Sequence, residues 1–177
     1  MDRFEIIVGD ITHSDAEAIV NAANTTLLGG SGVDGAIHRA AGPELYKVCR
    51  GLGGCETGKA KLTPGFRLKA WYVIHTPGPV WQGGGFGEPV LLASCYRSCL
   101  EVAASHQIHT LDFPSISTGI YGYPLPQASA IAVQTILGYL AEHPLPYKVR
   151  MVCHSEAAAA VYRQTLELYL SERTDRS

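Results

Sequence analysis

Short apolar runs alternate along the chain with longer amphipathic stretches, and this alternation predicts strands and helices in turn. The predicted strands span residues 4–8, 18–22, 59–63, 70–75, 109–113 and 148–153. The predicted helices span residues 33–41, 44–49, 90–105, 127–142 and 156–170. Strands that alternate with helices predict a single α/β domain in which helices cover a central sheet.

Length and composition agree with one globular domain. At 177 residues, with 46% hydrophobic and 17% charged positions, the chain has single-domain size and enough apolar residues for a core. We expect the domain to span residues 1–172 and residues 173–177 to form a polar tail. No apolar run approaches the roughly 18 residues that cross a membrane, and the first residues show no signal-peptide pattern. We therefore expect a cytoplasmic protein without a membrane partner.

Charge and cysteine content argue against several kinds of site. The formal charge of −2 argues against a general affinity for nucleic acid, so an anionic ligand must be held by local N–H groups. The five cysteines are an odd, scattered set, which indicates reduced thiols. Cys95 and Cys99 lie four residues apart on a predicted helix, but no second Cys or His pair matches their spacing. The sequence thus predicts neither a metal site nor a cofactor.

The segment 113–124 carries the strongest signal for a ligand. It follows a predicted strand, and the small residues between 115 and 119 leave backbone N–H groups open at the carboxyl end of that strand. Such loops hold a phosphate without a basic side chain. Tyr121 and Tyr123 add flat faces for a sugar or a base. The segment indicates a nucleotide-like ligand, although loops rich in Gly and Ser are also common as plain turns.

A second glycine-rich segment, residues 27–38, lies between a predicted strand and a helix that starts near Val33. This order points the amino end of a helix at an anion. No Gly-Lys-Ser/Thr follows, so the segment is not a Walker loop. Residues 30–35 match G-x-G-x-x-G by spacing alone, because the turn is long and the strand before it ends in polar residues. The segment therefore predicts an anion site of another kind.

Polar residues follow or interrupt four predicted strands, and in α/β sheets ligands bind beyond the carboxyl ends of strands. The polar positions are 9–10, 21–24, 115–123 and 153–155, and they predict one cleft at one edge of the sheet. Asp10 is placed to accept from an exocyclic amine or to cap a helix. Asn24 is placed to bind a ribose hydroxyl or to shape a turn. For Asp34, the only carboxylate in the glycine-rich segment, we favour a role in the anion site over helix capping.

Two histidines and a tryptophan each leave alternatives. His38 follows Asp34 by one helical turn, where it either pairs with that carboxylate or faces solvent. His75 is expected to be a hydrogen-bonded core residue at the end of a strand. Trp81 precedes three glycines and either flanks the cleft as a mobile wall or anchors its loop.

Several of these segments together resemble the signature of the macrodomain family. The matching segments are Gly9–Ile11, Ile19–Asn24, Gly29–His38 and Ser117–Pro124. Two more segments resemble the MacroD-type branch of that family, namely Cys55–Gly58 and His75–Trp81. The likeness runs in order from about residue 4 to residue 170.

This resemblance implies a fold and an activity. The fold is a three-layer α/β/α sandwich around a mixed six-strand sheet, with a cleft for ADP-ribose. The activity is hydrolysis: removal of mono-ADP-ribose from glutamate and aspartate side chains of proteins, and deacetylation of O-acetyl-ADP-ribose. Two alternatives use the same cleft, a reader that binds ADP-ribose without chemistry and a phosphatase acting on ADP-ribose 1″-phosphate. A nucleic-acid partner is expected only as an end that carries ADP-ribose.

The resemblance also assigns roles to single residues. Asp10 resembles the acceptor of the adenine amine, with the Ile11 N–H beside it, and Asn24 resembles the ligand of the distal ribose. The two diphosphate loops correspond to Gly30, Ser31, Gly32 and Val33, and to Ser117, Thr118, Gly119, Ile120 and Tyr121. Asp34 matches the acidic residue with a catalytic role, and Asn24 is grouped with it as a catalytic residue.

The chemistry expected of Asp34 is to orient a water or take its proton, while loop N–H groups stabilise the developing negative charge. A substrate phosphate is the alternative acceptor of that proton. Two positions depart from the family pattern. Ser31 replaces a glycine in a run of four, which costs on the order of 1 kcal/mol if φ is positive there. His154 stands where many relatives place an aromatic residue against adenine, and imidazole is a smaller platform whose charge changes near neutral pH.

Overall fold

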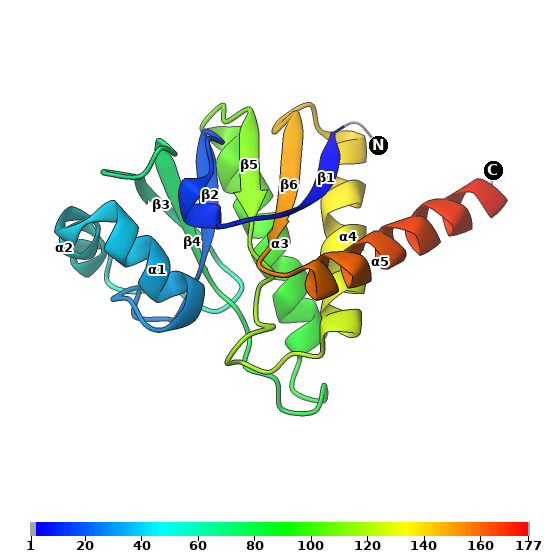
Figure 1. Cartoon of the computed structure of the whole chain (residues 1–177). Helices are drawn as coiled ribbons and strands as arrows, with labels where there is room; N and C mark the ends of the chain where they lie inside the picture. The colour runs from blue at the N-terminus through cyan, green and yellow to red at the C-terminus, as the bar shows by residue number, and fades with distance from the viewer. Residues whose placement is uncertain (1–2, 177) are drawn as a thin grey trace.

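The computed structural model describes residues 3–176 and shows a central sheet with helices on both sides (Figure 1). Over these residues six strands form one sheet in the order β1-β6-β5-β2-β4-β3. The strands are β1 (Phe4–Val8), β2 (Ala18–Ala23), β3 (Lys61–Pro64), β4 (Tyr72–Pro77), β5 (Thr110–Phe113) and β6 (Lys148–Cys153). Among them β3 runs antiparallel to β4, and every other neighbouring pair is parallel. The carboxyl ends of the five parallel strands therefore meet at one edge.

Helices cover both faces of this sheet. They are α1 (Gly32–Ala41), α2 (Pro43–Leu52), α3 (Glu88–Ser105), α4 (Leu125–Glu142) and α5 (Glu156–Asp175), with a short 3-10 helix at Ile11–His13. Helices α1 and α2 lie on one side of the sheet, and α3 and α4 lie on the other (Figure 1). The predicted α/β/α sandwich around a mixed six-strand sheet is thereby confirmed. None of the helices within residues 3–176 is long and apolar enough to cross a membrane.

Two apolar cores hold the layers together, one on each face of the sheet. The larger core contains Tyr96, Phe113 and Tyr162, and the smaller one, beneath α1 and α2, contains Ile37 and Leu45. Successive residues of a strand point to opposite faces, so in β2 Val20 enters the larger core and Ile19 the smaller one. The same alternation puts Asn21 on the face of Ile19, beneath α1. A buried amide thus lies beside the smaller apolar core, and it needs hydrogen-bond partners there.

Strands β1 and β6 begin and end at their predicted residues, and the other elements begin or end up to three residues away, apart from α5, which ends five residues later than predicted. Strands β3 and β4 begin two residues later than predicted, because turns occupy the residues before them. Helix α5 continues through Asp175, into the segment 173–177 that the sequence predicts as a polar tail. That segment contains no helix breaker, and Arg173 donates to the Tyr169 hydroxyl one turn earlier at 2.7 Å. The last residue of the predicted tail, Ser177, lies outside the described residues.

Candidate active site

The first loop, residues 24–31, joins β2 to α1 and is shaped by Asn24. The Asn24 Nδ2 group donates to Gly29 O at 2.8 Å, and its Oδ1 accepts from Thr26 Oγ1 at 2.6 Å and from Leu27 N at 3.1 Å. Every hydrogen bond that the Asn24 side chain makes among the described residues is therefore with this loop. The turn-shaping alternative is what the structure shows for Asn24.

Gly30 is the point where the first loop meets α1. A Cβ atom on Gly30 would lie 3.1 Å from Asp34 Oδ2 and 3.5 Å from Asn24 Nδ2, so both predicted catalytic side chains face this residue. A Cβ atom on Gly35 would collide with Gly30 O, so loop and helix pack backbone against backbone. Ser31 has a φ of −102°, which any residue adopts. The strain considered for Ser31 is therefore absent.

The second loop, residues 114–124, joins β5 to α4 and is held by its own small side chains. Ser117 Oγ donates to Pro79 O at 2.7 Å, and Thr118 Oγ1 donates to Ser115 Oγ at 2.8 Å. Ser117 itself has a φ of +67°, which costs a residue with a side chain roughly 1 kcal/mol. The structure therefore maintains a tight bend at the carboxyl end of β5.

Both loops present backbone N–H groups that donate to no acceptor within residues 3–176. These groups belong to residues 30–34 in the first loop and the start of α1, and to residues 119–121 in the second loop. The first set is the amino end of a helix, where unpaired N–H groups and the helix dipole favour an anion. Both loops follow parallel strands, so their donors lie at the same edge of the sheet. Open donors of this kind are suited to an anion, and phosphate binding by the two segments stays a prediction.

Asp34 is a buried carboxylate directly beneath the first loop, with 4% of its surface exposed. Its Oδ1 accepts from Asn21 Nδ2 at 2.9 Å and lies 3.5 Å from His38 Nε2. Burial raises the pKa of Asp34, while the Asn21 hydrogen bond and the nearby His38 act in the opposite direction. A carboxylate with a raised pKa is a stronger proton acceptor than an exposed one. His38 was expected either to pair with Asp34 or to face solvent, and the structure places it beside Asp34.

His75 supports Asn21 from the other side. The register pairs Asn21 with His75 across β2 and β4, and Asn21 Nδ2 lies 3.1 Å from His75 Nδ1. An ionised Asp34 carboxylate only accepts hydrogen bonds, so the NH₂ group of Asn21 must face Asp34. The second N–H of that NH₂ group then donates to a neutral His75. Burial, with a smaller effect of His38, lowers the pKa of His75 to about 3, so the ring is uncharged at neutral pH. His75 Nε2 in turn lies 2.9 Å from Thr63 Oγ1.

Comparison with known proteins places this arrangement in a family. The family model described as Macro domain matches residues 20–132. A macro domain-containing protein of Chlorobaculum tepidum is 59% identical over 160 residues, which is 90% of this chain and 93% of the relative. The O-acetyl-ADP-ribose deacetylase of Salmonella gallinarum is 49% identical over 168 residues, covering 93% of this chain and 94% of that enzyme. A variant of the Oceanobacillus iheyensis macrodomain, solved with ADPR, superposes with a TM-score of 0.92 at 44% identity, covering 95% and 94% of the two chains.

The chain belongs to the macro domain family. The predicted family resemblance is thus confirmed. The match with this macro domain covers 93% or 94% of each of these three relatives, so the two loops and the surroundings of Asp34 lie within the shared fold.

Tyr123 is not available to a ligand in this macro domain. It is 2% exposed and packs against Trp81, with 4.6 Å between the ring centroids. The prediction of a flat face for a sugar or base is therefore wrong for Tyr123, because its ring belongs to the core under the second loop. Tyr121 is partly exposed, and its carbonyl accepts from Trp81 N at 2.9 Å. Trp81 thus anchors its loop against the second loop.

Glu88 fastens the loop that follows Trp81. The Glu88 carboxylate, at the first residue of α3, accepts from the backbone N–H groups of Gln82 at 2.9 Å, Gly84 at 2.9 Å and Phe86 at 2.6 Å. Burial alone raises the pKa of Glu88, but these three donors outweigh it and bring the pKa down to about 2. Ionised Glu88 therefore holds residues 82–86 in place next to the site.

We expect the Glu88→Gln variant to lose, at neutral pH, the stabilising effect of the ionised carboxylate on residues 82–86. Because the folded pKa of Glu88 lies below its ordinary value of about 4.3, its stabilising effect is present above that value and is lost as pH falls through about 2. The Tm difference between wild type and variant should be largest at neutral pH and shrink as the pH approaches 2. Thermal unfolding across this range measures it. Glu156→Gln, at an exposed carboxylate of α5, is the matched control, and its Tm should stay close to that of wild type across the pH range. A Tm difference between wild type and Glu88→Gln that does not change with pH would contradict the role of the Glu88 charge.

The residues predicted for the adenine end lie at the ends of β1 and β6. These strands pair in parallel up to Val8 and Cys153, so Asp10 and His154 follow neighbouring strand ends. Asp10 caps the 3-10 helix: its Oδ1 accepts from Thr12 N at 2.9 Å and from Thr12 Oγ1 at 2.7 Å, and these bonds lower the pKa of Asp10. Its Oδ2 has a contact of 3.8 Å with an exposed His13. Ile11 is buried and His154 is exposed.

Sequence reasoning missed two residues that act on the site. Asn21 lies among the polar positions of its strand, yet its direct bond to Asp34 was not predicted. The signal was an amide inside an otherwise apolar strand, on the face that meets the following helix. Glu88 was missed because its partners are backbone groups of an irregular loop. Within residues 3–176 no group of three or more His, Cys, Asp or Glu side chains is placed to hold a metal ion.

Proposed function

We propose that this macro domain binds ADP-ribose along the carboxyl edge of the sheet and hydrolyses its esters. The esters are O-acetyl-ADP-ribose and mono-ADP-ribose on glutamate or aspartate side chains of proteins. One observation carries the proposal: Asp34, a buried carboxylate with a raised pKa, lies at the amino end of α1 directly beneath a loop of open N–H groups. The Salmonella relative carries the name of a deacetylase of this kind.

Binding rests on the two loops and on the ends of β1 and β6. The open N–H groups of residues 30–34 and 119–121 are suited to the two phosphates of ADP-ribose. Asp10 uses one carboxylate oxygen to cap the 3-10 helix, so the other is left to accept from the adenine amine, with the Ile11 N–H beside it. His154 is exposed at the next strand end and offers a ring to the adenine face. The Oceanobacillus neighbour, solved with ADPR, supports this ligand class.

Hydrolysis requires a water, a group that takes its proton and a place for negative charge. In the proposed step the water oxygen attacks the ester, the C–O bond to the sugar or acyl carbon breaks, and ADP-ribose and a carboxylic acid are released. Asp34 Oδ2 faces Gly30 and is suited to orient the water or to accept its proton. The loop N–H groups stabilise the oxyanion. A phosphate of the substrate is the alternative proton acceptor.

A reader without chemistry is the second candidate, and one observation favours it. The side chain of Asn24 makes three hydrogen bonds within the first loop, and Asp34 already accepts from Asn21. A reader needs only the two loops and the ends of β1 and β6, all of which are present.

The test follows release of ADP-ribose and acetate by mass spectrometry. Wild-type protein is incubated separately with O-acetyl-ADP-ribose, with a glutamate-linked mono-ADP-ribosylated protein and with ADP-ribose 1″-phosphate, and binding of free ADP-ribose is measured by calorimetry. We expect binding together with release from both substrates. Binding without release identifies a reader, and release of phosphate from ADP-ribose 1″-phosphate in place of either ester identifies a phosphatase.

A further inference from the structure

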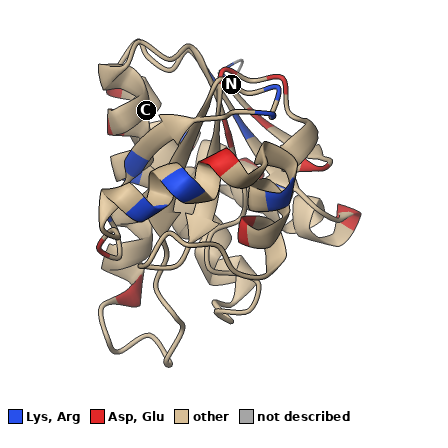
Figure 2. Ribbon diagram, turned by 90° about the vertical axis from the view of Figure 1, so that its left-hand side faces the viewer, with Lys and Arg blue, Asp and Glu red and all other residues tan. Residues whose placement is uncertain are grey.

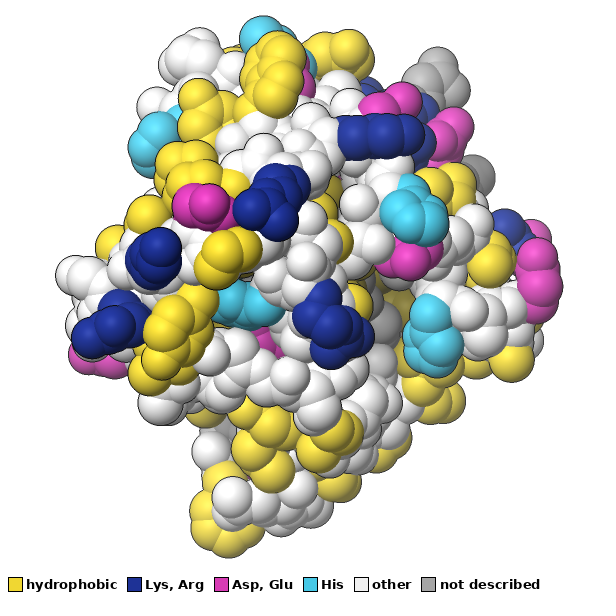
Figure 3. Space-filling view, turned by 60° about the vertical axis from the view of Figure 1, so that its left-hand side comes forward, with side chains coloured by type: hydrophobic (Ala, Val, Ile, Leu, Met, Phe, Trp, Pro, Cys, Tyr) yellow, Lys and Arg dark blue, Asp and Glu magenta, His cyan; other side chains and the backbone are white. Residues whose placement is uncertain are grey.

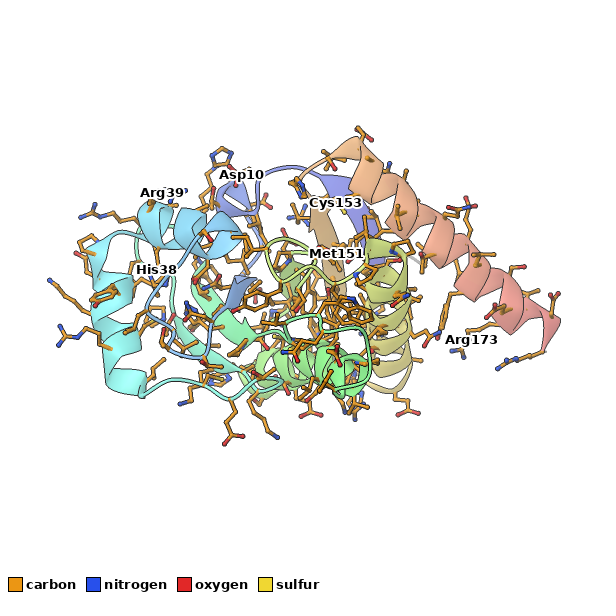
Figure 4. All side chains as sticks on the ribbon, turned by 90° about the horizontal axis from the view of Figure 1, so that it is seen from below. Asp10, His38, Arg39, Met151, Cys153 and Arg173 are labelled. Atoms are coloured by element: carbon orange, nitrogen blue, oxygen red, sulfur yellow. The ribbon has the colours of Figure 1, made fainter. Side chains whose placement is uncertain are left out.

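A hollow borders the first loop and shares Gly30 with it. It has a volume of about 490 Å³ and lies between α1 and α2. We name it the basic hollow, and its lining includes Leu28, Gly30, His38, Arg39, Tyr46 and Arg67. Figure 3 shows a histidine at its base, with basic and apolar side chains around it. Figure 4 shows His38 and Arg39 on the α2 side of α1, away from Cys153 at the end of β6.

Positive charge gathers around the basic hollow although the whole chain is slightly acidic. Residues 32–71, from the start of α1 to the start of β4, contain seven of the 14 Lys and Arg residues but three of the 16 Asp and Glu residues. One of those three is the buried Asp34. Lys and Arg lie on the outer helix of this side in Figure 2. The local field therefore favours an acidic partner.

The two arginines of the basic hollow have donors to spare. Arg39 is exposed and makes no hydrogen bond or ion pair with another residue of the described chain. Arg67 is exposed, and its Nη2 makes only a long contact of 3.9 Å with Glu44 Oε1. Tyr46 and Leu28, 42% and 40% exposed, add apolar surface between them. Guanidinium groups beside an apolar wall suit a carboxylate at the end of a short aliphatic chain, as in an Asp or Glu side chain.

The basic hollow is close to Asp34. His38 lines the hollow, and its Nε2 lies 3.5 Å from Asp34 Oδ1. Gly30 also lines it, and a Cβ atom on Gly30 would lie 3.1 Å from Asp34 Oδ2. The amino end of α1 is what separates the two, and a helix is roughly 10–12 Å across. An extended polypeptide, at roughly 3.4 Å per residue, crosses that width in about three or four residues.

We propose that the basic hollow binds an acidic side chain of the substrate polypeptide, about three or four residues from the ADP-ribosylated residue. This rests on the proposed function and names its substrate class: proteins modified within acidic segments. Arg39 and Arg67 hold the carboxylate, and Tyr46 and Leu28 contact the chain. A single-stranded nucleic acid fits less well, because it calls for a track of cations and several stacking platforms, and Tyr46 is the one Phe, Tyr or Trp side chain in the lining.

The experiment compares Arg39→Gln/Arg67→Gln with the control Lys47→Gln/Arg50→Gln. The control removes the same charge from exposed positions of α2 that do not line the hollow. Three ligands are used: free ADP-ribose, and two peptides with ADP-ribose on glutamate through a non-hydrolysable amide link. One peptide carries aspartates three and four residues away, and the other carries asparagines there. Calorimetry measures the dissociation constants, and ester-linked versions of the peptides give KM and kcat.

We expect wild type and control to bind the aspartate peptide about five-fold tighter than the asparagine peptide, the scale of two partly exposed ion pairs. The Arg39→Gln/Arg67→Gln variant should lose this preference through KM, with unchanged affinity for free ADP-ribose. Equal affinity of wild type for both peptides, or an equal loss in the control, overturns the proposal. So does an arginine-dependent preference for an ADP-ribosylated RNA end over the aspartate peptide.

The failures of the two proposals are distinguishable. If free ADP-ribose does not bind at all, the proposed function fails. If ADP-ribose binds but the aspartates add nothing, the basic hollow alone is overturned. If the aspartate peptide binds more tightly yet no ester is hydrolysed, the basic hollow stands and the protein is a reader.

Discussion

Hydrolysis of glutamate-linked ADP-ribose should fall about 100-fold or more in the Asp34→Ala variant, the usual scale for loss of a general base. The affinity for ADP-ribose should stay within a few-fold of wild type, because the open N–H groups that we assign to its phosphates come from the backbone. The variant removes the carboxylate beneath Gly30 and leaves the loop, which Asn24 shapes, in place. Single-turnover release of ADP-ribose, with calorimetry on the same preparation, separates the two effects.

The Asp34→Asn variant is the matched control for size. It keeps the volume of the side chain, and its amide oxygen still accepts from Asn21, but it cannot take a proton. We expect its activity to be as low as that of Asp34→Ala. Wild-type activity in either variant would remove Asp34 from the mechanism and point to a substrate phosphate as the proton acceptor. A parallel loss of ADP-ribose binding would show that Asp34 acts on the loop and not on the reaction.

The second large effect is expected for Asn21→Ala. This change leaves Asp34 Oδ1 and His75 Nδ1 without their hydrogen-bond donor, and lost partners in a buried site cost about 3 kcal/mol of unfolding free energy. The Asn21 bond also stabilises ionised Asp34, so its removal raises the pKa of Asp34 further. Since the ionised form is the proton acceptor, the acidic limb of the kcat/KM profile should move to higher pH. Denaturant unfolding and a pH–rate profile measure the two consequences.

Thr63→Val separates stability from chemistry in this network. Thr63 contacts the far nitrogen of His75 and does not contact Asp34, so its loss should destabilise the fold while leaving the acidic limb where it is. If both variants shift the pH profile equally, the shift reflects general loosening and Asn21 is not a positioning residue. If neither shifts it, Asp34 does not set the acidic limb.

Much of the fold follows from local patterns in the chain. The short apolar runs of β2 and β4 and the Gly42-Pro43 break between α1 and α2 predict those elements to within about two residues at the ends that they mark. The end of α5 was not predictable from polarity alone. Residues 171–175 are polar, yet a polar segment continues a helix when nothing breaks it, and Arg173 binds back to Tyr169. Polarity describes exposure, and exposure does not end a helix.

Some features of the candidate site were likewise predictable from local sequence, and others were not. The two loops were predictable, because glycine and serine between a strand and a helix expose N–H groups wherever the chain folds as α/β. Whether Ser31 was strained and whether Tyr123 was exposed depended on φ angles and on packing against Trp81, which no local pattern encodes. Glu88 was hidden for a related reason. The three donors to Glu88 are backbone N–H groups, and every residue except proline has one, so the residue types around Glu88 do not predict these bonds.

The far end of helix α5 is a suitable place to attach a label or an anchor. The helix begins at Glu156, next to the exposed His154, and its 20 residues run to Asp175. At 1.5 Å per residue the helix carries Asp175 roughly 30 Å from the candidate adenine end. Figure 4 shows Arg173 near its far end, on the side of the molecule opposite α1. A fluorophore or surface anchor attached there would leave the cleft and the basic hollow open, so the domain is well arranged for use as an immobilised ADP-ribose probe.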